Sequence, residues 1–359
     1  MRLHLSRRTF LAGTAAASSA LALGRGVYAQ EPLKVGFVYV GPIGDYGWTH
    51  GHELGRKAVV EHFGDKVATT YVENVAEGPD AERVIRQLAS SGHGLVFTTS
   101  FGFMNPTVRV ARQFPQVKFE HATGYQTAPN LAVYNARFYE GRAVCGAIAG
   151  HMSQSGLCGY VASFPIPEVV MGINAFALAA QKVNPDFRVN VVWINSWYDP
   201  GKEGDAAKAL IDQGADIISQ HTDSPAPLQV AEQRGVHGFG QASDMAAYAP
   251  NAQLTAILDD WSEYYIQRVQ AVLDDAWETH SIWYGLKEGM VKMAPYGDAV
   301  TDDARQAAEA VKEGIIAGTL HPFTGPIENQ AGEVMIADGA TATDDEMQKM
   351  DWWVEGVQA

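Results

Sequence analysis

The sequence predicts an α/β protein with two lobes, each built on a mostly parallel sheet. From Lys34 onward, short β-branched runs alternate with longer amphipathic runs, which is typical of parallel strands connected by helices. This alternation repeats about ten times, and a single open sheet rarely holds more than about ten strands. A chain of 359 residues is also long enough for two domains.

The expected strands fall into two series of five. The first series is 35–40, 68–72, 95–98, 117–121 and 131–134. The second series is 157–162, 189–193, 217–221, 236–240 and 254–258. Each run is short and rich in β-branched or aromatic residues, as strands usually are.

Helical patterns lie between these strands, with apolar residues recurring at helical spacing. They cover 48–63, 81–90, 106–114, 140–152, 168–183, 205–213 and 226–234. After Gly289 the periodicity weakens: a helix is expected at 301–317, a short one at 344–350, and loops at 318–342. Thr301 followed by two aspartates is a helix start signal.

No linker rich in Gly, Ser or Pro separates the two series, so we expect short extended crossings near 134–137, 258–260 and 285–289. Several crossings form a hinge about which two Rossmann-like lobes can rotate. The expected boundaries are 30–136 plus 259–287 for lobe 1, and 137–258 plus 288–359 for lobe 2.

The first 29 residues are expected to be an export signal. Arg7 and Arg8 precede Thr9, Phe10 and a small, apolar run, and Val27-Tyr28-Ala29 ends the segment as a cleavage site would. This pattern indicates a twin-arginine signal peptide and a free periplasmic product. The mature chain from Gln30 would keep 22 basic and 41 acidic residues.

Composition excludes several classes of protein. The formal net charge of −15, without basic runs, argues against binding nucleic acid or anionic lipid. Two cysteines cannot form a four-thiolate zinc site. In an oxidising compartment Cys145 and Cys158 could form a disulfide, or they could stay buried free thiols, and the sequence leaves both alternatives open.

The candidate site lies in the loops that follow the strands. In an open parallel sheet, ligands bind beyond the carboxyl ends of the strands. Aromatic residues next to short polar side chains recur there, and this combination suits a planar, uncharged ligand that forms hydrogen bonds. The candidate ligand-binding residues are Trp48, Phe101, Asn105, Phe164, Trp197, Asp199, Asp223 and Asp244.

Catalytic and metal-binding motifs are missing from the sequence. It contains no G-x-S-x-G elbow, no Walker loop and no H-E-x-x-H. His50 and His52 lie two residues apart, so on a helix they point to opposite sides and cannot share a metal ion. We therefore expect no catalytic residue, no metal and no cofactor.

Several segments together resemble the basic membrane protein (Bmp, PnrA-like) family of ABC transporter substrate-binding proteins. They are Val35 to Gly41, Asp45-x-x-Trp48, Val117-Lys118-Phe119, Asn135 to Gly141 with Tyr139-Glu140-Gly141, and Ala209 to Ile217 with Gly214-Ala215-Asp216. The resemblance extends to about Trp261. It implies the type I periplasmic binding protein fold, a purine nucleoside or related ligand, and a membrane permease as the partner.

The resemblance also implies roles for individual residues. The family stacks the base between aromatic rings, which correspond here to Trp48 and Phe164 with Phe101 nearby. A family acid that binds the edge of the base corresponds to Asn105.

Two other family positions differ in this chain. The aspartate that binds ribose in the family falls on Ala242, leaving only Asp244, and a family lysine falls on Asp259. A ribose hydroxyl without its partner would cost about 1–3 kcal/mol. These departures favour a free purine base such as adenine over a nucleoside.

The resulting hypothesis is a periplasmic binding protein, expected to be a monomer, that closes on a purine and releases it unaltered to a permease. Two alternatives remain. One is a binding protein for a sugar or another polar solute, because aromatic rings also stack on sugars. The other is a periplasmic nucleoside hydrolase, which would need a cluster of carboxylates around a metal ion.

Overall fold

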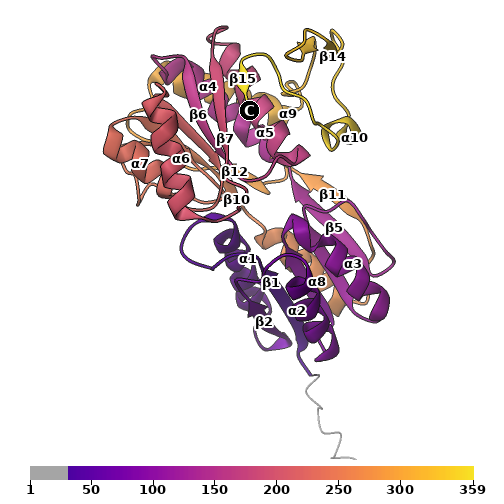
Figure 1. The fold of residues 1–359 in the computed structure, drawn as a ribbon. Coiled ribbons are helices and arrows are strands. Elements are labelled where there is room, and N and C mark those ends of the chain that lie inside the picture. The colour runs from indigo at the N-terminus through magenta and orange to yellow at the C-terminus, as the bar shows by residue number, and fades with distance from the viewer. Residues whose placement is uncertain (1–30) are drawn as a thin grey trace, which may run out of the picture. The chain divides into compact units, whose positions relative to one another are not determined.

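The computed structural model describes residues 31–359, and Leu33–Ala359 form one compact unit that contains two large sheets (Figure 1). The expected signal peptide at residues 1–29 lies outside the described residues. Most strand pairs are parallel and helices connect them, so the predicted α/β class is confirmed.

The first sheet has six strands, and all of its neighbours pair in parallel. In spatial order they are β11 (Ser281–Tyr284), β5 (Leu131–Ala136), β4 (Lys118–Ala122), β3 (Leu95–Thr99), β1 (Leu33–Tyr39) and β2 (Val67–Val72). The five strands expected here are all present. The sequence pattern missed β11, which is only four residues long and lies far along the chain from its partner β5.

The second sheet has seven strands and repeats this arrangement. In spatial order they are β12 (Val291–Met293), β10 (Gln253–Asp259), β9 (His237–Gly240), β8 (Ile217–His221), β6 (Leu157–Ala162), β7 (Arg188–Trp193) and β15 (Val357–Gln358). Only the β10–β12 pair is antiparallel. The five expected strands are again present, and their order matches that of β2-β1-β3-β4-β5 in the first sheet.

Helices connect the strands of both sheets. Those that connect strands within the first sheet are α1 (Gly47–Phe63), α2 (Pro79–Ser90) and α3 (Met104–Gln113), and α8 (Ser262–Leu273) packs against α1. The others are α4 (Phe138–Met152), α5 (Pro167–Gln181), α6 (Pro200–Asp212), α7 (Ala226–Arg234) and α9 (Asp302–Ala317). Every helix predicted between strands is confirmed, with ends that differ by a few residues.

The chain passes between the two sheets three times. It leaves the first sheet after β5 and enters α4, returns between β10 and α8, and leaves again between β11 and β12. These passages coincide with the expected crossings. The predicted lobe boundaries, 30–136 plus 259–287 and 137–258 plus 288–359, remain a prediction.

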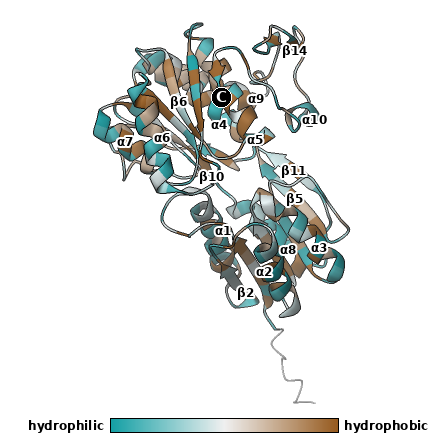
Figure 2. Cartoon of the chain, viewed as in Figure 1, coloured by the Kyte–Doolittle hydropathy of each residue, from teal (hydrophilic) through white to brown (hydrophobic). Residues whose placement is uncertain are grey.

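The strands are predominantly hydrophobic and the helices turn hydrophilic residues outward (Figure 2). Where α4 packs on α5, small residues allow close contact. An added Cβ at Gly150 would lie 2.7 Å from the carbonyl oxygen of Ala180, so only glycine permits this approach. Cys145 on α4 and Cys158 on β6 are both buried free thiols, and burial raises the pKa of Cys145 to about 12.

The segment after α9 differs from the prediction of loops at 318–342. It contains a two-stranded sheet of β13 (Ile327–Glu328) and β14 (Val334–Ile336), followed by α10 (Asp344–Met347). Strands this short lack an alternating pattern that could reveal them. Thr343 begins α10 with a capping box that includes Glu346.

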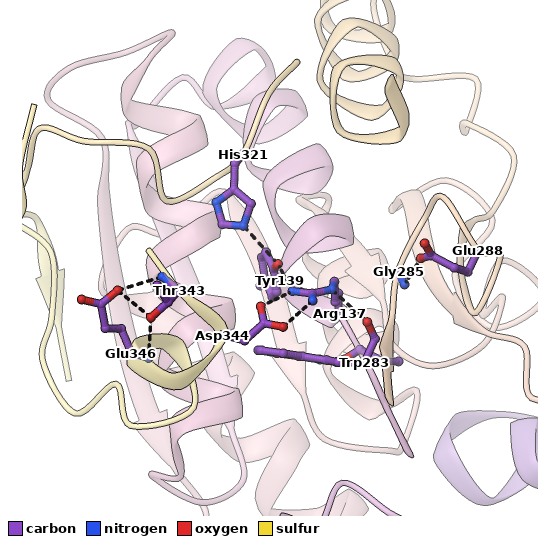
Figure 3. A network of polar contacts seen from close by, with 10 residues as sticks. Arg137, Tyr139, Trp283, Gly285, Glu288, His321, Thr343, Asp344 and Glu346 are labelled. Atoms are coloured by element: carbon purple, nitrogen blue, oxygen red, sulfur yellow. Dashed lines mark hydrogen bonds and ion pairs between the residues drawn. The ribbon is translucent and has the colours of Figure 1, made fainter. Parts of the chain in front are cut away.

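Arg137 joins this C-terminal segment to the first crossing (Figure 3). Its guanidinium forms a bidentate ion pair with Asp344, at 2.9 and 2.7 Å, and also donates to the carbonyl oxygen of Trp283 at 3.0 Å. The same guanidinium lies 4.5 Å from the centre of the Trp283 ring. One side chain therefore connects β5, β11 and α10.

A buried ion pair stabilises the first sheet and its helix α8. Glu120 on β4 is fully buried and accepts hydrogen bonds from Arg268 at 2.5 Å, from Tyr264 at 2.5 Å and from Trp277 at 2.7 Å. Arg268 lies on the buried face of α8. A charged residue on that face interrupts the apolar pattern, which explains why the sequence did not reveal this helix.

We predict that Arg268→Met lowers the free energy of unfolding by about 3–5 kcal/mol, because it leaves the Glu120 carboxylate buried without its cation. Urea unfolding followed by circular dichroism measures the change. Adding Glu120→Gln should recover part of the loss, since the double variant buries no charge. A loss below about 1 kcal/mol for Arg268→Met would contradict this account.

Candidate functional site

A narrow cavity lies where the carboxyl ends of strands from both sheets meet. Its lining residues come from the loops and helix starts that follow the strands. They are Val40, Trp48, Ser100, Phe101, Thr123, Glu168, Trp197, His221, Asp223 and Gln241. The space inside the cavity is about 30 Å³, enough for about two water molecules, so the lining has to move apart before a larger ligand can enter.

The strand order explains why the cavity forms at this place. In the first sheet, β2 lies on one side of β1 and β3 lies on the other. In the second sheet, β7 and β8 lie on opposite sides of β6 in the same way. The loops after β1 and β3, and those after β6 and β8, therefore diverge and leave a crevice, the usual ligand site of open α/β sheets. Here the two crevices face the same cavity.

Aromatic rings line the cavity from both sheets. Trp48, at the start of α1, donates from Nε1 to the carbonyl oxygen of Thr99 at 2.7 Å, which fixes the orientation of its indole. Phe101 follows β3 and Trp197 follows β7. Phe164 does not line the cavity, but its ring centre lies 5.0 Å from that of Trp197 and supports it.

Polar side chains supply the rest of the lining. The backbone N–H of Asp223 donates to the carbonyl oxygen of Trp197 at 3.0 Å. Nε2 of His221 lies 3.6 Å from Oε1 of Glu168. These groups give one side of the cavity both donors and acceptors.

Burial changes the protonation of these groups. Desolvation, with the nearby negative charge of Glu203, raises the pKa of Asp223 to about 8. Burial also raises the pKa of Asp259 and lowers that of His221. At neutral pH, Asp223 is therefore mostly a neutral carboxylic acid that can donate as well as accept.

Some buried polar atoms near the cavity have no hydrogen-bond partner among the described residues. Both carboxyl oxygens of Asp259 and two guanidinium nitrogens of Arg142 are in this state. The third nitrogen of Arg142 donates to Gln241, a lining residue. Such atoms usually bind ordered water or a ligand, so this side of the cavity is polar.

Four of the eight candidate residues, Trp48, Phe101, Trp197 and Asp223, line the cavity together. The other four, Phe164 among them, do not. Asn105 is exposed on α3. Asp199 caps α6 by accepting from the backbone N–H of Lys202 at 3.1 Å.

Asp244 is likewise engaged away from the cavity. It is exposed and accepts from Nε2 of Gln253 at 2.7 Å and from the backbone N–H of Ala246 at 3.0 Å. Caps and turns favour aspartate for such bonds, which explains why its position in the sequence resembles a site position.

The candidate residues omit six of the lining residues. They are Val40, Ser100, Thr123, Glu168, His221 and Gln241. Their positions just after strands are the signal that could have identified them. Glu168 is an exception, because it belongs to the first turn of α5 and looks like an ordinary helix-start carboxylate.

The loop between β1 and α1, together with Gly47 at the start of α1, contacts loops that follow strands of the second sheet. The backbone N–H of Gly47 donates to Oγ of Ser243 at 2.6 Å, and the hydroxyls of Tyr46 and Tyr198 lie 3.2 Å apart. Gly47 has φ +77°, and an added Cβ would lie 2.5 Å from the carbonyl oxygen of Asp223. Glycine is therefore needed there for the two sides of the cavity to meet.

We predict that Gly47→Ala prevents this approach, whereas Gly44→Ala does not. Both glycines have positive φ, but a Cβ at Gly44 meets nothing closer than 4.0 Å. Small-angle X-ray scattering should show a larger radius of gyration for Gly47→Ala, and its free energy of unfolding should fall by about 1–3 kcal/mol. Equal scattering from both variants would show that this contact does not limit the approach.

Within residues 31–359, no helix is both long and apolar enough to cross a membrane. Across that same part of the chain, His, Cys, Asp and Glu side chains nowhere form a group of three or more that could hold a metal ion.

Comparison with known proteins places this geometry in context. The family described as ABC transporter substrate-binding protein PnrA-like (Bmp) matches residues 33–321. A protein of Brucella abortus (strain 2308) named purine-binding protein is 59% identical over 335 residues, covering 93% of this chain and 95% of the relative. A Haloferax volcanii protein, provisionally named an ABC transporter glucose-binding protein, is 36% identical and covers 93% of this chain and 83% of the relative.

Solved structures share the fold. A solute-binding protein of an ABC transporter from Aeropyrum pernix K1 superposes with a TM-score of 0.70 at 19% identity, covering 81% of this chain and 93% of that one. Another from Conexibacter woesei has a TM-score of 0.65 at 22% identity, with coverages of 80% and 98%. The chain therefore has the type I periplasmic binding protein fold.

Proposed function

Because the chain belongs to the PnrA-like (Bmp) family of ABC transporter substrate-binding proteins, we propose that it binds a purine in the cavity between its two sheets and delivers it to the permease of an ABC importer. The ligand leaves unaltered, so the protein acts as a carrier and not as an enzyme. The protein works as a monomer in the periplasm, after export by the twin-arginine route.

One observation carries this proposal: aromatic rings that follow strands of both sheets line the same small cavity. Trp48 and Phe101 follow strands of the first sheet, and Trp197 follows a strand of the second. Flat heterocycles stack on such rings, and each stacked base contributes about 1–3 kcal/mol. A purine would thus have apolar faces against the rings and its polar edge against Asp223, His221 and Gln241.

Adenine is the purine that fits the polar side best. A neutral carboxyl group at Asp223 offers one O–H donor and one carbonyl acceptor. The edge of adenine offers the complement, a ring nitrogen that accepts and an amino group that donates. The ionised form of Asp223 could only accept, and it would face the lone pair of the ring nitrogen.

The names of the two relatives suggest different ligands, a purine and glucose. The purine is favoured because that relative is 59% identical, against 36% for the other, and because three aromatic rings line the cavity. Glucose is therefore the competitor to include in every binding experiment, and we expect it to bind at least 100-fold more weakly than adenine.

We predict that Trp48→Ala weakens adenine binding by about 10- to 100-fold, because one stacking face is lost. Isothermal titration calorimetry measures the affinity, and circular dichroism checks that the variant is folded. Trp48→Phe keeps an aromatic face and should lose less than about tenfold. An unchanged affinity for Trp48→Ala would remove this residue from the binding site.

We also predict that adenine affinity falls several-fold between pH 6 and pH 9. Asp223 is neutral below its pKa of about 8 and ionised above it, so the donor to the ring nitrogen disappears as the pH rises. The same polar region contains four other titratable groups. They are Glu203 and Asp259 near this carboxyl, and His221 and Glu168 in the cavity lining.

The variant Asp223→Asn tests whether Asp223, and not one of these neighbours, causes the pH dependence. An amide keeps one donor and one acceptor at every pH, so binding at pH 7 should persist within about fivefold and its pH dependence should flatten. An Asp223→Asn protein with the same pH profile as the wild type would assign the dependence to another group.

A further inference from the structure

The exposed carboxylate of Glu77 contacts Trp197 and both sequence neighbours of Phe101. Trp197 and Phe101 are two of the aromatic residues that line the cavity. Glu77 lies in the loop between β2 and α2. Its Oε1 accepts three hydrogen bonds, from Oγ of Ser100 at 2.6 Å, from the backbone N–H of Gly102 at 3.0 Å and from Nε1 of Trp197 at 3.2 Å. Ser100 and Gly102 are the two neighbours of Phe101 in the sequence.

These bonds connect different halves of the chain. Glu77, Ser100 and Gly102 belong to loops that follow strands of the first sheet, whereas Trp197 follows β7 of the second. The bonds to Ser100 and Gly102 thus stay within one half, and the bond from Trp197 links the two halves. If the halves separate, only the bond from Trp197 has to break.

The local sequence is suited to this contact. A Cβ at Gly102 would overlap the carboxyl group of Glu77, so a side chain there would displace this carboxyl group from its present position. The ring centre of Phe164 lies 5.0 Å from that of Trp197. The indole of Trp197 thus contacts both Phe164 and Glu77.

We propose that Glu77 is a positioning residue that fixes Phe101 and Trp197 as ring surfaces of the closed cavity, with the Trp197 bond forming only when the halves meet. This role rests on the proposed function for the identity of the ligand. A carboxylate oxygen already held by Ser100 and Gly102 is preorganised to receive the indole N–H. When the two halves close, the indole of Trp197 reaches its place in the cavity wall, and Glu77, Ser100 and Gly102 do not have to rearrange.

The expected effect is moderate, because Glu77 is exposed and water competes for its hydrogen bonds. Glu77→Ala should weaken adenine binding by about three- to tenfold, through faster dissociation, since the contact belongs to the closed state. Glu77→Gln keeps an acceptor oxygen and should stay within about twofold of the wild type. Glu61→Ala removes an equivalent exposed charge from α1, away from these contacts, and should change nothing.

A double-variant comparison separates this role from simple support of the turn at residues 100–102. Trp197→Phe keeps a ring but has no indole N–H. Stopped-flow fluorescence measures the rate at which adenine dissociates. Glu77→Ala should accelerate dissociation less in the Trp197→Phe background than in the wild type. Equal acceleration in both backgrounds, or none in either, would overturn the proposal.

A measurement in the closed state stays independent of the purine assignment if the protein is saturated with adenine, or with glucose should no purine bind. In protein labelled with 5-fluorotryptophan, the 19F resonance of Trp197 is assigned by its loss in Trp197→Phe. It should shift in Glu77→Ala and not in Glu61→Ala. An unmoved resonance overturns the role of Glu77, whereas failure of the wild-type protein to bind any purine overturns the proposed function alone.

Discussion

The site depends on one constraint, that the carboxyl ends of two parallel sheets with the same strand order face a common cavity. Loops after parallel strands are free to vary because they form no part of the sheet, so they can carry aromatic and polar side chains without disturbing the core. The chain passes between the two sheets three times, after β5, after β10 and after β11, and these passages keep the two halves together. They allow rotation about the passages but resist separation, which suits a protein that must enclose and release a ligand.

The polar side of the cavity shows how enclosure and recognition are linked. Asp223 and Asp259 are held where burial favours their neutral forms, and Arg142 leaves two nitrogens without a partner among the described residues. Such groups are costly in an empty, closed site and become favourable when a ligand satisfies them. In the proposed function, selectivity would follow from the penalty for leaving them unsatisfied, and the aromatic rings would supply affinity for flat ligands in general. The exposed contact of Glu77 with Trp197 adds a link between closure and the position of one ring.

The sequence was a good guide to the fold and a partial guide to the site. All ten strands of the two series were recognisable because short runs with β-branched or aromatic residues alternate with longer amphipathic runs along the chain. Helix α8 was not, because its buried face carries Arg268, whose partner Glu120 lies far away in the sequence. Position after a strand selected Trp48, Phe101 and Trp197, which line the cavity, but also Phe164, which does not. It could not separate Asp223 in the cavity lining from Asp199 and Asp244, which accept from local backbone. The same residue type serves both purposes, and only the three-dimensional arrangement distinguishes them.

Native mass spectrometry of the protein purified under non-denaturing conditions, and again after incubation with equimolar adenine and glucose, shows whether the protein carries an intact purine. We expect a one-to-one complex with the mass of a purine base, which disappears on denaturation and yields the unaltered base. A complex with glucose instead, a bound metal ion, or recovery of a cleaved product would contradict the account.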